Sequence, residues 1–357
     1  MGERENPICV LHVLLDEPGG ASAALDVVEA NFPEEVSSSR LLISPSALRL
    51  PSASLVRALL KVRKRVHETG AHVVHAHGVR AGVGVRLARV FGMRVPIIVT
   101  VQGLHALRRS SGVWRALAVR LTRFALRSAS SVIVISQSDR TSIIEEGLAL
   151  EPGVLLTSQS FAPLTIRDRA AARRQLGLGD GEKVVLWIGR FVEQKAPEVF
   201  VAAIGRLKTS PAALMVGDGP LMEGVTRLRD QLGVPIRFEG WQEDPSMHVA
   251  ACDVMVSTAR WEGFPLMLLE AATTGACLVA TDTPGNRDAV EAGIPMAVVP
   301  PDEPVALAEA IDRLLDDDET RATMGVEARR VSVTLSQAGR SVQPIVDAYR
   351  RAIRGTG

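Results

Sequence analysis

Apolar residues occur along this chain in short unbroken runs, separated by longer stretches in which they recur every three or four positions. Unbroken runs are typical of parallel strands buried on both faces, and the longer spacing is typical of amphipathic helices. The runs predict strands at Ile8–Leu15, Val73–Ala76, Ile97–Val101, Val132–Ile135, Val184–Ile188, Ala212–Val216, Val254–Val256, Leu278–Ala280 and Met296–Val299. The spaced stretches predict helices at Leu55–Glu68, Val113–Arg127, Pro197–Lys208, Pro304–Leu315, Glu319–Val331 and Ser336–Arg354.

This alternation of strands and helices predicts an α/β fold made of right-handed βαβ units in doubly wound sheets. A chain of 357 residues is too long for one compact core. A polar stretch with a proline, Ser158–Pro163, and a glycine-rich turn, Gly177–Gly181, indicate where one domain ends and another begins. We therefore expect two Rossmann-like domains facing across a cleft, residues 1–162 and 163–335. The segment 336–357 is expected to form a C-terminal helix that packs back on the N-terminal domain.

Composition narrows the protein class. Apolar residues make up 46% and charged residues 23%, which excludes a disordered chain, and the net charge of +1 argues against a bulk nucleic-acid binder. The first 160 residues nevertheless carry six more basic than acidic residues, and the remainder carries five more acidic ones. The three cysteines are far apart and the N-terminal histidines are scattered in sequence, so neither a disulfide framework nor a metal site is expected. With no signal-peptide pattern and no apolar run of membrane-spanning length, we expect a cytoplasmic protein.

Loops after the predicted strands of the second half carry the candidate chemistry, because ligands of doubly wound domains bind beyond the carboxyl ends of strands. Gly189, Arg190 and Lys195 follow the strand at 184–188, and Pro197 opens the next helix. A glycine, two cations and a helix N-terminus together suit a diphosphate group. From these residues alone, solvated loop charges remain the alternative.

Two further loops add candidate ligands. Gly217-Asp218-Gly219 either lets the backbone approach a flat ligand such as a base or is an ordinary tight turn. Glu262 precedes a helix that we expect to begin at Pro265, and Glu270 lies inside that helix among apolar residues. A carboxylate in such a place is unfavourable unless it accepts hydrogen bonds, for instance from sugar hydroxyls. The alternative for Glu270 is an exposed helix face.

Over residues 183–291 these loops resemble the retaining GT-B glycosyltransferases of glycosyltransferase family 4, the glycosyl transferases group 1. Gly189-Arg190 with Lys195, then Gly217–Gly219, then the Glu-x7-Glu pair of Glu262 and Glu270 follow in that family's order and spacing. Glu262 begins the segment Glu-Gly-Phe-Pro-Leu, and Thr281–Gly285 looks like the family's next glycine loop.

The first half resembles the family less specifically. Pro18-Gly19-Gly20-Ala21 looks like the glycine loop near the diphosphate, and Val74–Gly78 looks like the family's second-strand signature. Gln102 stands where the family usually has the histidine of Thr-x-His-Gly, and Gln159-Ser160 replaces a usual Asn-Gly. A glutamine forms hydrogen bonds but carries no proton, so His105 is expected to take over part of that role. A degenerate acceptor site with little activity is the other interpretation.

The resemblance implies transfer of a sugar, with retention, from a UDP- or GDP-linked donor to a glycan or lipid-linked acceptor in cell-surface polysaccharide or glycolipid synthesis. It implies no cofactor and no metal, the nucleoside diphosphate sugar being a co-substrate. The implied catalytic residues are Arg190, Lys195 and Glu262. The implied donor-binding residues are Gly19, Gly20, Gly189, Gly217, Asp218, Gly219, Gly263, Phe264, Leu266 and Glu270. The implied acceptor-binding residues are His77, Gln102 and His105.

Other functions remain open from sequence. A sugar-nucleotide epimerase shares the fold, but it needs acid–base groups that the loops do not locate. A non-catalytic scaffold would have lost the donor residues, and all of them are present. The acidic run Asp316–Asp318 is expected to be a solvated helix end and not a metal site.

Two predicted helices of the first half are basic on one side. Their cations are Arg57, Lys61, Lys64 and Arg65 in the first, and Arg115, Arg120, Arg123 and Arg127 in the second. Leu117, Leu121 and Phe124 lie opposite the cations of the second helix. Either these apolar stripes are buried in the domain and the cations are solvated, or the helices hold the protein on an anionic membrane surface.

Overall fold

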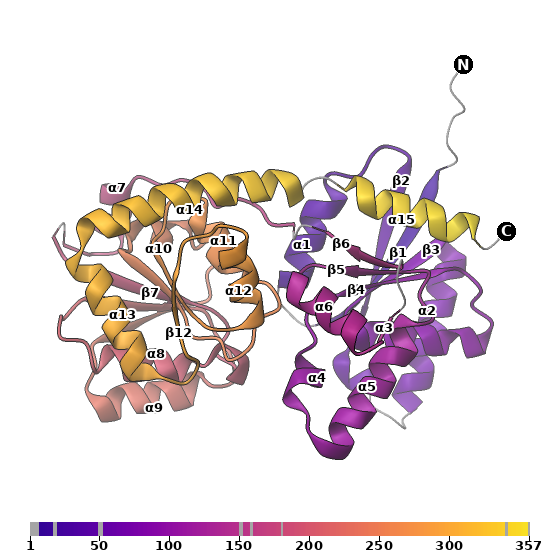
Figure 1. The fold of residues 1–357 in the computed structure, drawn as a ribbon, viewed down its shortest axis with the longest axis horizontal. Coiled ribbons are helices and arrows are strands. Elements are labelled where there is room, and N and C mark those ends of the chain that lie inside the picture. The colour runs from indigo at the N-terminus through magenta and orange to yellow at the C-terminus, as the bar shows by residue number, and fades with distance from the viewer. Residues whose placement is uncertain are drawn as a thin grey trace. The chain divides into compact units, whose positions relative to one another are not determined.

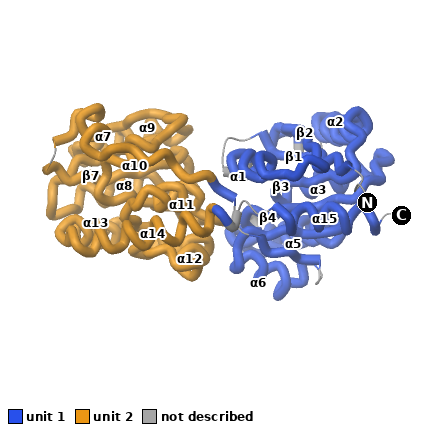
Figure 2. Tube along the Cα trace, turned by 90° about the horizontal axis from the view of Figure 1, so that it is seen from above, with its two compact units in different colours: residues 1–161, 337–357 blue, residues 162–336 orange. Residues whose placement is uncertain are grey.

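The computed structural model describes residues 7–16, 20–48, 53–149, 153–157, 160–179, 181–339 and 342–355. They divide into two compact units, shown in Figure 2. Unit 1 comprises residues 1–161 and 337–357, and unit 2 comprises residues 162–336. Figure 1 shows helices on both faces of the sheet in each unit. Among the described helices, none combines the length and apolar character needed to cross a bilayer.

Unit 1 contains a six-stranded parallel sheet in the order β2-β1-β3-β4-β5-β6. Its strands are β1 (Ile8–Leu15), β2 (Val36–Ile43), β3 (Val73–His77), β4 (Ile97–Val101), β5 (Ser131–Val134) and β6 (Val154–Leu156). Its helices are α1 (Gly20–Glu29), η1 (Pro45–Leu48), α2 (Ala53–Thr69), α3 (Val79–Ala88), η2 (Arg89–Phe91), α4 (His105–Arg109), α5 (Gly112–Leu126), α6 (Gln137–Glu145) and α15 (Gln343–Arg354).

Side chains of successive strand residues point to opposite faces, and the two faces of this sheet are covered by different helices. Leu11 and Val13 of β1 pack in one core with buried residues of α2 and α3. Val10 packs on the other side with Val346 and Tyr349 of α15. The C-terminal helix is therefore part of the core of unit 1.

Unit 2 contains a second six-stranded parallel sheet, in the order β12-β11-β10-β7-β8-β9. Its strands are β7 (Val184–Ile188), β8 (Ala212–Val216), β9 (Ile236–Gly240), β10 (Val254–Ser257), β11 (Leu278–Thr281) and β12 (Ala297–Val299). Its helices are α7 (Arg169–Gln175), η3 (Glu193–Lys195), α8 (Pro197–Ile204), α9 (Met222–Leu232), α10 (Ser246–Ala251), α11 (Leu266–Ala272), α12 (Pro284–Glu291) and α13 (Pro304–Asp316). The long α14 (Asp318–Gly339) begins in unit 2 and ends in unit 1.

The structure corrects two features of the predicted element order. Three strands, β2, β6 and β9, were not predicted from the sequence. In addition, the two helices predicted at the C-terminus divide later than expected. The first continues to Gly339, and the second begins at Gln343 and not at Ser336.

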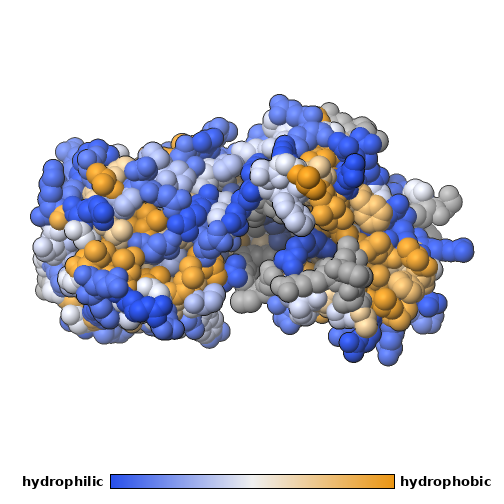
Figure 3. Space-filling view, turned by 90° about the horizontal axis from the view of Figure 1, so that it is seen from below, coloured by the Kyte–Doolittle hydropathy of each residue, from blue (hydrophilic) through white to orange (hydrophobic). Residues whose placement is uncertain are grey.

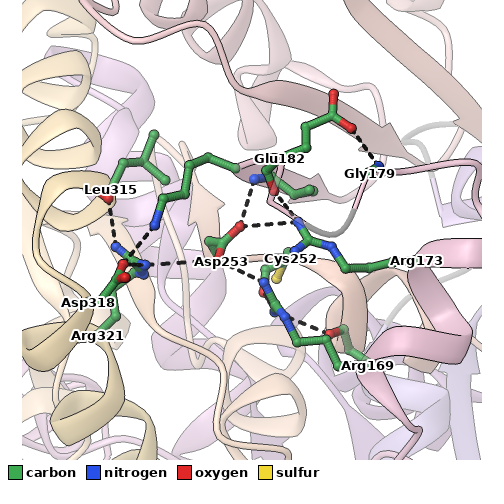
Figure 4. A network of polar contacts seen from close by, with 12 residues as sticks. Arg169, Arg173, Gly179, Glu182, Cys252, Asp253, Leu315, Asp318 and Arg321 are labelled. Carbon is green, nitrogen blue, oxygen red and sulfur yellow. Dashed lines mark hydrogen bonds and ion pairs between the residues drawn. The ribbon is translucent and has the colours of Figure 1, made fainter.

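A polar network ties together the amino ends of β7 and β10 (Figure 4). Asp253 accepts the backbone N–H of Val184 at 2.8 Å and is paired with Arg169 at 2.7 Å and Arg173 at 3.6 Å. Arg321 of α14 lies 4.0 Å from the same carboxylate. The guanidinium groups also donate to carbonyl oxygens, Arg169 to Cys252 and Arg173 to Glu182. This network is structural, because it lies at the end of the sheet opposite the loops described next.

Candidate functional site

The centre of the unit 2 sheet is a topological switch point. β7 and β10 are neighbours, and the chain continues from β7 to β8 on one side and from β10 to β11 on the other. In open parallel sheets, ligands bind at the carboxyl ends of the strands on either side of such a switch point. Gly189–Lys195 and Thr258–Pro265 are the loops after β7 and β10, so the structure places the sequence-predicted donor residues where ligands of such folds bind.

An ion pair joins the two loops. The Nζ of Lys195 is paired with the Oε2 of Glu262, whose side chain is only 11% exposed. Gln194 also joins the two loops, because its side-chain Nε2 donates to the carbonyl of Trp261 at 3.1 Å and its backbone carbonyl accepts the N–H of Arg260 at 2.8 Å. The cation and the carboxylate that the sequence assigned separately, to a diphosphate and to a sugar, are thus partners in this structure.

Ala196, next to that lysine, has a left-handed backbone conformation with φ of 44° and is fully buried. A non-glycine residue held in this region costs about 1–3 kcal/mol, so the surroundings must enforce it. The hydroxyl of Thr258 donates toward the carbonyl oxygens of Lys195 and Ala196, at 2.7 and 2.9 Å, and accepts Nε1–H of Trp187 at 2.9 Å. Thr258 and Ala196 therefore fix the position of Lys195, and sequence reasoning singled out neither.

Gly217 and Gly219 are needed for two loops to pack together. With φ of 131°, Gly217 would place a Cβ atom 1.9 Å from the carbonyl oxygen of Gly189. Gly219, with φ of 155°, would place one 2.7 Å from the carbonyl oxygen of Phe191. Asp218 is exposed, and its carboxylate accepts the N–H of Gly219 at 2.6 Å. The turn at 217–219 therefore has a structural role in holding the loop after β7.

The loop after β11 packs on the other side of Glu262. A Cβ on Gly285 would lie 2.7 Å from the carbonyl oxygen of Glu262 and from Gly263, so only glycine permits this approach. The fully buried Asn286 donates from Nδ2 to the carbonyl of Thr281 at 2.7 Å. These contacts, with the N–H of Gly285 donating to the carbonyl of Glu262 at 3.2 Å, hold the start of α12 against the backbone of Glu262-Gly263.

Glu270 lies within α11 and is largely buried. Burial raises the pKa of its carboxyl group to about 7. Within the described part of the chain, its carboxylate has no hydrogen-bond or ion-pair partner. It is therefore a carboxyl group that titrates near neutrality and has unused acceptor capacity. Phe264 and Leu266, between the two glutamates, are partly exposed, and Arg190 is exposed.

The predicted acceptor residues of unit 1 lie at the carboxyl ends of adjacent strands. His77 ends β3, and Gln102 follows β4 and is partly exposed. Gly78 donates its N–H to the carbonyl of Thr100 at 2.7 Å, which joins the two strand ends. Gly20 begins α1, whereas Gly19, Gln159 and the side chain of His105 lie outside the described residues.

The expectation of scattered histidines is wrong for three of them. His12 and His75 face each other across β1 and β3, and His77 lies two residues along β3 on the same face. One ligand atom from each lies within 4.8 Å of those of the other two. The strand register brings them together, and a period of two in His75 and His77 was the only sign of it in the sequence.

Comparison with known proteins places these features in a family. The family model described as "Glycosyl transferase 4-like domain" matches residues 12–157, and "Glycosyl transferases group 1" matches residues 182–317. The α-D-kanosaminyltransferase of Streptomyces kanamyceticus is 30% identical over 311 residues, which cover 79% of this chain and 78% of that protein. A D-inositol 3-phosphate glycosyltransferase of Corynebacterium glutamicum is 26% identical over 343 residues, covering 87% of this chain and 79% of that protein. The crystal structure of HepE from Anabaena in complex with UDP has the same fold, with a TM-score of 0.76 at 20% identity, over 95% of this chain and all of that one.

Proposed function

Because the chain belongs to the GT-B glycosyltransferases of glycosyltransferase family 4, we propose that it transfers a sugar from a nucleoside diphosphate sugar to a glycan or lipid-linked acceptor with retention of anomeric configuration. The observation that carries this proposal is the pair of Lys195 and Glu262 at the switch point, with the unpartnered carboxyl of Glu270 in the helix that follows. We propose a uridine nucleotide as the first donor to test, since HepE was solved with UDP.

In the proposed reaction, the bond between the anomeric carbon and the β-phosphate oxygen breaks, and the acceptor oxygen bonds to that carbon. The acceptor's hydroxyl proton passes to the departing diphosphate. Arg190 and Lys195 stabilise the charge that develops on the phosphate, because fixed cations at a partly buried site need little reorganisation during the reaction. When the donor binds, the ammonium of Lys195 keeps its contact with Glu262 and donates another of its three N–H bonds to the phosphate, while the second carboxylate oxygen of Glu262 accepts from the sugar.

The other residues of the proposed donor site are mostly in unit 2. Glu270 accepts hydrogen bonds from the ribose hydroxyls, and Gly189, Gly217, Asp218 and Gly219 lie near the diphosphate and the base. The backbone of Gly263, Phe264 and Leu266 binds the transferred sugar. For unit 1, the family resemblance assigns His77, Gln102 and His105 to the acceptor and Gly19-Gly20 to the diphosphate. Neither a cofactor nor a metal takes part in the chemistry.

Nucleotide-sugar binding and hydrolysis test this function together. Thermal shifts of the purified protein with UDP-, GDP- and ADP-sugars should select one base, because a ligand at about 100 times its dissociation constant adds roughly 2.7 kcal/mol of stability. The selected donor should be hydrolysed slowly without acceptor, releasing the nucleoside diphosphate with or without EDTA. A protein that is stabilised by none of these donors and hydrolyses none would contradict the proposal.

We further propose that unit 1 attaches to an anionic membrane surface through α5, in keeping with a lipid-linked acceptor. Two members of the predicted apolar stripe of α5 are exposed, Leu117 to 44% and Phe124 to 40%, and so are Val113 and Trp114 at the start of the helix, to 82% and 73%. Figure 3 shows apolar surface gathered on this unit. Arg120 is also exposed beside this stripe, and an exposed indole among aliphatic side chains and cations suits the lipid–water interface.

Three of the four α5 arginines, however, are engaged within the protein. Arg115 is paired with Glu146 at 3.2 Å, and Arg123 and Arg127 donate to the carbonyl of Gly147. The apolar stripe is therefore expected to contribute more to membrane binding than these cations. In α2 the predicted arrangement holds, since Leu55, Leu59 and Val62 are buried and the four cations are exposed.

Co-sedimentation with vesicles separates these contributions. Trp114→Ser should reduce binding to anionic vesicles several-fold, while Trp241→Ser, which changes a tryptophan of unit 2 that is 70% exposed, should not. Protein that stays in the supernatant at low salt would contradict attachment. Equal loss in both variants would assign binding to nonspecific apolar contact.

A further inference from the structure

We propose that His12, His75 and His77 of unit 1 form a binding site for Zn²⁺ or a similar late first-row divalent cation. The ligand atoms of the three imidazoles lie within 4.8 Å of one another. They come from two neighbouring strands whose register, His12 opposite His75, is fixed by backbone hydrogen bonds in the middle of the sheet. A site on adjacent buried strands is more rigid than one on loops, and this rigidity favours a defined coordination geometry.

The three side chains are of a type that binds metal ions. An imidazole nitrogen that carries no proton offers its lone pair to a cation. Neutral imidazole is a preferred ligand of Zn²⁺, Ni²⁺ and Cu²⁺, whereas Mg²⁺ and Ca²⁺ prefer oxygen.

The hydrogen bonds inside the cluster are incomplete, and this points to a missing ligand. His12 Nδ1 lies 2.9 Å from His77 Nε2, so one contact of His12 is made. Its other nitrogen, Nε2, is buried with no hydrogen-bond partner, and so is Oε1 of Glu29. These two atoms lie 3.8 Å apart, too far for a hydrogen bond. A cation near them would satisfy both, since imidazole nitrogen and carboxylate oxygen are both ligands of zinc.

The charges that face the cluster tolerate a divalent cation. Asp26 and Glu29 come from α1, and both are paired with a single cation, Arg40 of β2, Asp26 at 2.7 Å. These three side chains sum to one negative charge. The group that faces the cluster from α15 is Tyr349, a phenol that is hydrogen-bonded to His75 and carries no charge. The surrounding side chains would therefore compensate part of the charge of a bound dication.

Residues around the histidines are placed to hold their rings. Tyr349 Oη lies 2.7 Å from Nδ1 of His75, and Thr100 Oγ1 lies 2.6 Å from its Nε2. If the phenol keeps Nδ1, His75 binds the cation through Nε2 once the threonine hydroxyl rotates away. Zinc–nitrogen bonds of about 2.0–2.1 Å set tetrahedral ligand atoms roughly 3.4 Å apart, so no separation in the cluster has to shorten by more than about 1.4 Å. Tyr349 would then be a positioning residue of the kind that tunes affinity about 10–100-fold.

Titration of the metal-free protein with Co²⁺ tests the site. After EDTA treatment and dialysis, the wild-type protein should bind one equivalent of Co²⁺ and show visible d–d absorption. The spectrum should lack a thiolate charge-transfer band, which excludes cysteine as a ligand. Zn²⁺ should displace Co²⁺ and raise the melting temperature. His77→Asn should weaken binding at least 100-fold, and Tyr349→Phe about 10–100-fold. His72→Asn should bind as wild type does, although the exposed His72 contacts the backbone of Cys9.

Several outcomes would overturn this site. They are a wild-type protein that binds no Co²⁺ or Zn²⁺, a thiolate charge-transfer band, or equal loss of binding in His72→Asn and His77→Asn. If His77→Asn does not unfold cooperatively, the variant is not folded and its metal affinity is not used. The stoichiometry of Co²⁺ bound to the wild type and the affinity of Tyr349→Phe then test the site. EDTA should lower the melting temperature without changing donor hydrolysis, so that failure of this site is distinguishable from failure of the proposed function.

Discussion

Glu270 is the residue of unit 2 whose protonation should respond to pH near neutrality. Its pKa is raised to about 7 by burial, whereas in the unfolded chain it would be near 4.5. Between these values the folded protein holds a proton that the unfolded chain has lost. Stability is therefore expected to fall as pH rises through this window and to level off above it, by roughly 3 kcal/mol at most. Glu270→Gln should remove this dependence in urea unfolding of the protein between pH 4.5 and 8.

Donor binding should show the opposite pH dependence. Ribose hydroxyls donate to the charged carboxylate, so binding must remove the proton from Glu270. As the pH increases toward 7, the affinity for the donor should rise by up to tenfold per pH unit. Above pH 7 the affinity should be constant. Calorimetry with a nucleotide sugar, whose diphosphate diester does not titrate here, measures this slope. A slope that persists in Glu270→Gln would show that another group titrates.

Lys195 and Glu262 should act as one unit in catalysis, because they are in contact. Each alanine variant is expected to lower kcat by about 10²–10³-fold, the effect of removing one preorganised group. The double variant should lose much less than the product of the two losses. Lys183→Ala is the matched control, since Lys183 is paired with Asp318 at 2.7 Å and lies at the other end of β7. Additive losses would mean that the ion pair seen here has no part in the reaction.

Sequence singled out the residues of the switch-point loops that have distinctive chemistry and missed those that hold these loops through the backbone. Lys195, Glu262 and Glu270 were recognisable because charged residues beside buried strands need a reason. Thr258 and Ala196 carry no such signal, since their roles depend on the pairing of β7 with β10, which the sequence does not show. The contact of Lys195 with Glu262 joins residues 67 positions apart and likewise required the fold.

At the scale of elements, the strands that sequence missed share one property: β2, β6 and β9 all lie at the edges of their sheets. An edge strand has one neighbour and is more exposed, so it does not need a continuous apolar run. β2 reads VSSSRLLI and β9 reads IRFEG, and both mix charged and apolar residues. The central strands β1, β4, β7 and β8 were predicted to the residue, because burial on both faces determines their composition.

The Asp253 network should be essential for the stability of unit 2 but not for its chemistry. Asp253→Asn removes the charge that faces Arg169, Arg173 and Arg321 while keeping the side-chain shape. Breaking a buried charge network in this way costs about 3–5 kcal/mol. Asp318 also contacts Arg321 but is exposed, so Asp318→Asn should change the free energy of unfolding little. Urea unfolding compares the two variants, and donor affinity measured on folded protein should be unchanged in both.

A large loss of donor affinity in folded Asp253→Asn would contradict this assignment. Equal stability of the two aspartate variants would contradict it as well, because it would mean that the three arginines do not depend on the buried anion.

At the scale of the whole molecule, the chain crosses between its units twice, and its last helix completes the first one. The face of the unit 1 sheet that carries Val10 and Ile98 is covered by Val346 and Tyr349 of α15. Arg350 of the same helix is paired with Glu35 at 2.9 Å. Folding of unit 1 therefore requires residues that are synthesised after the whole of unit 2, a consequence that element prediction alone did not reveal.

Removal of α15 should unfold unit 1 and spare unit 2. A chain ending at Gly339 loses the apolar cover of the sheet, and exposing several fully buried side chains costs more than a marginally stable unit can tolerate. The selected nucleotide sugar should still bind this truncated chain and raise its remaining unfolding transition. Val346→Ala, which keeps the helix, should lower the stability of unit 1 by about 1–3 kcal/mol, while Arg351→Ala on the exposed side should not. Loss of both transitions on truncation would show that unit 2 depends on unit 1 for its fold, and an unchanged first transition would show that α15 is dispensable.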